Sequence, residues 1–141
     1  MNKMAAMTNR NAAAFWAFLL GFGLWASSRF VVGKLEPWDA DWPYYSGMML
    51  VGGTALGLTL PGQARAVFFG LWVGQALALL LPGHDRSWFL LGCVTTGIGG
   101  LLGLTGYLAG VVAHVGWRKI NPAAEANTEP AGKHDTSESG R

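Results

Sequence analysis

Charged side chains are scarce in this sequence. Asp, Glu, Lys and Arg make up 13% of its 141 residues, about half of their share in a soluble domain. The formal net charge is only +2, and the basic residues form no concentrated patch of the kind that binds nucleic acid. The composition therefore argues against a nucleic-acid partner, and the length indicates one domain.

Cysteine is nearly absent as well. Cys93 is the only one, so the chain cannot form an intrachain disulfide or a cysteine-based metal cluster. The sequence also lacks a phosphate-binding loop, a zinc-protease helix and a nucleophile elbow. We therefore predict no enzymatic activity, no metal and no cofactor.

Apolar residues and glycine are abundant instead. Hydrophobic residues make up 51% of the chain, which has 21 glycines. The last apolar run, from Trp88 to Trp117, has 30 residues without one Asp, Glu, Lys or Arg. As a helix it would be about 45 Å long, which exceeds the roughly 30 Å hydrocarbon core of a bilayer. Four such runs are recognisable, at residues 12–32, 43–60, 63–81 and 88–117.

These runs predict an all-α, integral membrane four-helix bundle. A backbone that crosses lipid must satisfy its own hydrogen bonds, which favours helices over open strands. Pro61-Gly62 and Pro82-Gly83 mark the ends of the second and third runs. We expect a short cytoplasmic N-terminus over 1–11, the bundle over 12–117, and a disordered cytoplasmic tail over 118–141, which has few large apolar residues.

The first run has an alternative interpretation as a cleaved signal peptide. Lys3 and Arg10 precede it, and Ala26-Ser27-Ser28 resembles a small-residue cleavage site. The apolar stretch continues through Val32, however, beyond the usual length of such a region. We therefore expect the run to be retained as a membrane span.

Orientation follows from the basic residues of the short flanks. With the N-terminus inside, five basic residues flank the inner ends of the helices and three flank the outer ends. This bias predicts a multi-pass protein, of a bacterial inner membrane, with both termini in the cytoplasm. The inner residues are Lys3, Arg10, Arg65, Arg118 and Lys119, and the outer ones are Arg29, Lys34 and Arg86.

Small residues recur at helical spacing in all four runs. Lipid gives helices little hydrophobic reason to associate, so they meet by close van der Waals contact that small residues permit. The spacing therefore predicts packing surfaces, whose partner is another helix of this chain, a second copy or a different membrane protein. The predicted packing residues are Gly53, Gly57, Gly70, Gly74, Gly92, Thr96, Gly99, Gly103, Gly106 and Gly110.

The predicted outer loop between the first two runs combines acids and aromatics. Aromatic side chains are typical of headgroup depth, with acids in the water beyond. A docking surface or a cation site are alternatives, although a calcium loop requires more oxygen ligands and a turn glycine. The possible docking residues are Glu36, Trp38, Asp39, Asp41 and Trp42.

A few polar residues fall inside the apolar runs, namely Gln75, Thr95, Tyr107 and His114. Such residues either bond between helices or line a path for an ion or solute. No buried carboxylate accompanies them. The sequence thus favours a non-catalytic packing or accessory subunit of a larger membrane complex, with lipid and a further membrane protein or a second copy as partners. The alternative is a small oligomeric channel or transporter.

Overall fold

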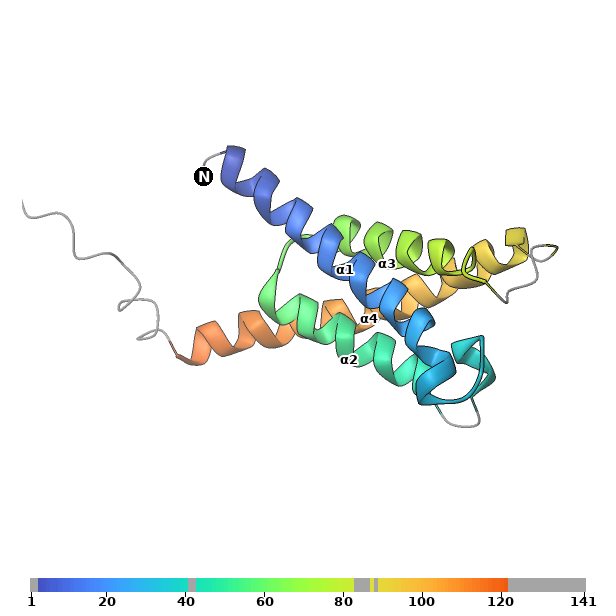
Figure 1. The fold of residues 1–141 in the computed structure, drawn as a ribbon. Helices are drawn as coiled ribbons and strands as arrows, with labels where there is room; N and C mark the ends of the chain where they lie inside the picture. Colours follow the sequence, from blue (N-terminus) through green and yellow to red (C-terminus); the bar gives the residue numbers. More distant parts are fainter. Residues whose placement is uncertain (1–2, 41–42, 83–86, 88, 122–141) are drawn as a thin grey trace, which may run out of the picture.

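The computed structural model describes residues 3–40, 43–82, 87 and 89–121. In this part of the chain the structure is all-helical and has no strand, which confirms the predicted all-α class (Figure 1). Its elements are α1 (Lys3–Val31), the short 3-10 helix η1 (Pro37–Asp39), α2 (Tyr44–Thr59), α3 (Ala64–Ala78) and α4 (Phe89–Ile120).

The two outer helices extend further than the sequence predicted. Helix α1 begins at Lys3 rather than Ala12, because the alanines and methionines of this segment are strong helix formers. The helix start expected at residue 12 therefore falls nine residues inside α1. Helix α4 continues beyond Trp117 to Ile120, so the predicted disordered tail does not begin at 118. The rest of that tail, residues 122–141, lies outside the described residues.

The inner helices end at local signals. After α2, Gly62 has φ +84°, a left-handed conformation that glycine adopts without strain, and it turns the chain into α3. Helix α3 ends at Ala78, not Leu81. The Leu80 and Leu81 amides donate to carbonyls three residues back, so this segment is a tightened turn that leads into Pro82.

The four helices pack as two pairs, α1 with α3 and α2 with α4. A Cβ added at Gly74 of α3 would overlap the carbonyl oxygen of Phe18 in α1. A Cβ added at Gly53 of α2 would overlap the carbonyl oxygen of Gly103 in α4. Glycine thus lets backbones touch in both pairs, which maximises van der Waals contact.

The interior of the bundle is small and its outside is apolar. The core cluster includes Ala13, Ala17, Met49 and Leu71, all fully buried. Many large apolar side chains point outward, among them Phe30, which is 87% exposed. Exposed apolar side chains on this scale indicate a surface that contacts something other than water.

Two helical segments, Met7–Val31 and Phe89–Ile120, are long and apolar enough to cross a membrane. Only 28% and 33% of their most apolar stretches are buried, less than expected of a soluble core helix. Helices α2 and α3 have 16 and 15 residues, which corresponds to about 24 and 22 Å. By length and composition, therefore, two helices qualify as spans where the sequence predicted four.

Candidate functional site: a buried polar network and an apolar groove

Gln75 is the centre of the buried polar network. Its side chain lies in α3 and is fully buried. Its Oε1 accepts hydrogen bonds from the Tyr45 hydroxyl of α2 at 2.5 Å and from Nε1 of Trp25 in α1 at 3.4 Å. Its Nε2 donates to the Leu71 carbonyl at 3.2 Å. One amide group therefore links three helices, and its donor and acceptor are both engaged.

The fourth helix meets this network at Gly99. A Cβ there would overlap the Tyr45 hydroxyl oxygen, so α4 approaches the network only because residue 99 has no side chain. On the loop side, the Trp38 ring of η1 packs edge-on against Trp25 at 4.6 Å and Tyr45 at 6.0 Å between centroids. Such aromatic pairs add about 0.5–1.5 kcal/mol beyond burial. This arrangement fixes the helices relative to one another.

The polar residues that the sequence singled out do not form one path. Tyr107 bonds to the turn between α2 and α3, where its hydroxyl donates to the Leu60 carbonyl at 3.0 Å, whereas Gln75 lies near the other end of α3. The Thr95 hydroxyl bonds within its own helix, to the Gly92 carbonyl. His114 is half-buried in the last third of α4. Gln75 and Tyr107 therefore serve interhelical bonding at separate places.

Sequence reasoning missed the donors to Gln75. Tyr45 and Trp25 were not identified, nor was Trp72, whose Nε1 donates to the Cys93 carbonyl of α4 at 2.9 Å. The available signal was the amphipathic character of Tyr and Trp, whose polar ends usually form a hydrogen bond when the ring is buried. Pairing each with its acceptor required the three-dimensional arrangement of the helices.

The predicted packing residues of α4 face helices of the same chain. Gly92 lies against Leu79, the C-cap residue of α3, and Gly103 lies against Leu71 of α3. Further along, Gly106 approaches the Leu50 backbone of α2. Thr96 is fully buried, and its hydroxyl bonds within α4. The remaining predicted positions also pack against backbone of a neighbouring helix: Gly53, Gly57 and Gly110 between α2 and α4, and Gly70 and Gly74 between α3 and α1.

The outer loop is only partly directed outward. The Trp38 Nε1 donates to Oε2 of Glu36 at 2.7 Å, and its ring packs inward as described above. Asp39 is exposed. Asp41 and Trp42 lie outside the described residues. The described residues contain no group of three His, Cys, Asp or Glu side chains placed to hold a metal ion.

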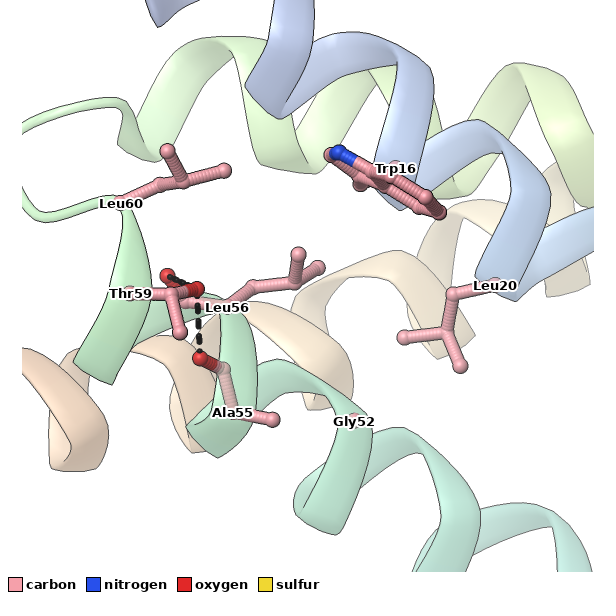
Figure 2. Close-up of a pocket in the computed structure, with 7 residues that line it drawn as sticks. All are labelled: Trp16, Leu20, Gly52, Ala55, Leu56, Thr59 and Leu60. Atoms are coloured by element: carbon pink, nitrogen blue, oxygen red, sulfur yellow. Dashed lines mark hydrogen bonds between the residues drawn. The ribbon is translucent and has the colours of Figure 1, made fainter.

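An apolar groove separates α1 from α2, as Figure 2 shows. The two helices touch where the Leu20 side chain lies against Gly52. The groove extends from there towards Trp16 on α1 and Leu60 at the C-cap of α2. Its volume is about 480 Å³. The lining residues are Trp16, Leu20, Gly52, Ala55, Leu56, Thr59 and Leu60.

The groove can bind a partner through its shape and through apolar contacts. The Thr59 hydroxyl points back to the Ala55 carbonyl of its own helix at 2.9 Å. The Trp16 ring is 55% exposed and forms the α1 wall. On the α2 side the groove is lined in part by the small residues Gly52 and Ala55, which would let another chain approach the α2 backbone closely.

Comparison with known proteins adds no assignment, because the chain matches no protein-family model, no curated protein and no solved structure.

Proposed function

We propose that this chain is a non-catalytic, multi-pass membrane protein that acts as a packing subunit of a larger membrane complex. The observation that carries the proposal is the groove between α1 and α2, the larger of two apolar grooves in the described part of the bundle. In this proposal a transmembrane helix of a partner protein lies across the groove. It inserts side chains between Trp16 and Leu56.

The membrane location is supported by the outward apolar side chains of α1 and α4. Although α2 and α3 are short, each contacts both of the longer helices, α1 and α4. A bilayer accommodates short spans by local thinning at modest cost. We therefore propose that all four helices cross the membrane.

The arrangement of helix ends supports the proposed topology. The start of α1, the turn between α2 and α3, and the end of α4 lie towards one end of the molecule (Figure 1). The described charged residues at that end are basic, which suits the cytoplasmic side of a bacterial inner membrane. Both termini are then cytoplasmic.

A solute path through a single bundle has less support. A path needs polar groups that are free to exchange partners with the permeating species. The amide of Gln75 is instead engaged by Tyr45, Trp25 and its own helix. The channel alternative would therefore require a path between copies of the chain.

Site-specific photocrosslinking tests the proposal. A photoreactive amino acid replaces Ala55, which lines the groove, in cells that express the full chain. The matched control replaces Leu58, an exposed residue of α2 outside the groove lining. We expect a cross-linked product with a second membrane protein from position 55 and none from position 58.

Three results would contradict this function. Equal products from both positions indicate random collision in the membrane. A product of twice the chain mass indicates a second copy in the groove, which favours the oligomeric alternative. Absence of any product from position 55, with the chain purified alone and monomeric in mild detergent, rejects the packing-subunit proposal.

A further inference from the structure

A second, smaller groove lies between α3 and α4 and has a charged side chain in its lining. Its volume is about 210 Å³. Arg65, the second residue of α3, is exposed, and every other lining residue is apolar. The lining comprises Ala64, Arg65, Phe68, Phe69, Leu101 and Leu104.

The charged part and the apolar part of this groove lie at different positions along the bundle. Arg65 lies beside the turn between α2 and α3, at one end of the bundle. From there the apolar lining follows α3 towards Phe69, and follows α4 back from the level of Tyr107 towards Leu101. Phe69 and Leu101 are each 54% exposed, so this wall is open to the surroundings of the bundle. Charge thus lies at the end and apolar surface towards the middle.

The local backbone adds positive potential at the same end. Helix α3 has no acidic residue in its first turn, and its N-cap residue Gln63 makes no side-chain capping bond. The first amide groups of a helix carry a partial positive charge that favours anions. Arg65 projects from this same first turn.

The charge distribution of the described residues points the same way. The start of α1, which contains Arg10, and the end of α4, which contains Lys119, lie towards this end of the molecule. The described carboxylates, Glu36 and Asp39, belong to η1 and its N-cap at the opposite end. There, Arg29 and Lys34 of the adjoining segment balance them. The described charges are thus basic at this end and mixed at the other. An anionic surface is therefore attracted to the end that contains the mouth of the groove.

We infer that this groove binds an anionic phospholipid. The guanidinium of Arg65 pairs with the headgroup phosphate, because arginine presents a fork of donors that matches phosphate oxygens. One acyl chain lies along the groove between Phe68 and Leu104. A soluble anion would use only the charged end, and an apolar peptide would gain nothing from Arg65; a phospholipid matches both ends of the groove in the order in which they occur.

The inference goes beyond the proposed packing function and rests on it only for membrane insertion. Its test uses the full chain in dodecyl maltoside, with the thermal unfolding midpoint as the readout. Dioleoyl phosphatidylglycerol is added in one series, dioleoyl phosphatidylcholine in a second, and glycerol phosphate in a third. We expect a higher Tm with phosphatidylglycerol than with phosphatidylcholine, and no shift with glycerol phosphate, which lacks acyl chains.

Three variants locate the effect. Arg65→Gln should abolish the difference between the two lipids, while Arg10→Gln, an exposed basic residue outside the groove, should preserve it. Leu101→Trp fills the apolar part and should reduce the shift although Arg65 is intact. All three positions are exposed, so we expect each variant to retain the Tm of the parent protein before lipid is added.

Several outcomes would overturn the inference. Equal Tm shifts with the two lipids would show that the groove does not select the headgroup. The same conclusion would follow if Arg65→Gln left the difference in Tm between the lipids unchanged, or if Arg10→Gln reduced that difference as much as Arg65→Gln. A full shift with glycerol phosphate would leave a soluble anion as the ligand. A chain that stays soluble without detergent rejects membrane insertion itself, whereas a detergent-dependent chain without lipid preference rejects only this site.

Discussion

The hydroxyl of Tyr107 lies between two backbone groups of the turn that joins α2 to α3. It donates to the Leu60 carbonyl at 3.0 Å and accepts from the Gln63 amide at 2.7 Å. The accepting Leu60 carbonyl belongs to the C-cap residue of α2, and the donating Gln63 amide belongs to the N-cap residue of α3. A residue of the fourth helix therefore closes the ends of the second and third.

Replacing Tyr107 by Phe tests this relationship. The variant keeps the ring but loses both hydrogen bonds, so we expect the free energy of unfolding to fall by about 1–3 kcal/mol. Thermal or denaturant unfolding in mild detergent provides the measurement. Thr105→Val is the control, because that exposed hydroxyl bonds only to Leu101 of its own helix. A loss for Thr105→Val as large as that for Tyr107→Phe would refute a specific capping role.

The bond between Tyr45 and Gln75 should appear as coupling in a double-mutant cycle. Gln75→Leu leaves the Tyr45 hydroxyl without the acceptor seen in the structure, at a cost of about 1–3 kcal/mol. In a Tyr45→Phe background the same change should cost less, with a coupling energy of about 0.5–3 kcal/mol. Unfolding of the four proteins in detergent measures it. Strictly additive effects would mean that this contact contributes nothing to stability.

Two glycines of α2 form a matched pair for the packing argument. A Cβ at Gly53 would overlap the Gly103 backbone of α4, whereas a Cβ at Gly47 would meet nothing within 4 Å. We expect Gly53→Ala to destabilise the bundle by about 1–3 kcal/mol, the usual cost of overpacking. Gly47→Ala should be neutral or stabilising by up to about 1 kcal/mol, because alanine favours helix. The measurement is the unfolding midpoint of each variant in mild detergent, and we expect a lower midpoint for Gly53→Ala. A lower midpoint for Gly47→Ala than for Gly53→Ala would contradict direct backbone contact between α2 and α4.

The sequence was informative where the signal was local. The helical class followed from apolar runs, and the turn at Gly62 followed from the Pro-Gly pair. The spacing of small residues marked positions such as Gly103 that lie at helix contacts, because a step of three or four residues keeps one face of a helix. These features need only neighbouring residues to be recognised.

Features that depend on which helices meet could not be read from the sequence. Nothing local shows that α1 pairs with α3 rather than with α2, since every helix has a small-residue face. The donors to Gln75 and the grooves on either side of the bundle follow from that pairing. The start of α1 at Lys3 was missed for another reason: apolar periodicity does not detect a helix that continues on alanine propensity into polar sequence.

The pairing of α1 with α3 leads to a last prediction, that α1 is retained in the mature protein. Trp25 and Ala17 of α1 are buried in the bundle, and the Gly70 and Gly74 backbones lie against α1. Cleavage after Ser28 would expose this surface of α3 and remove one donor to Gln75. Intact-mass spectrometry of the protein purified from membranes should therefore give the mass of a chain that includes Met7–Val31. A mass that corresponds to a chain starting near residue 29 would show that the segment is a signal peptide, and the packing of α1 against α3 would then not exist in the mature protein.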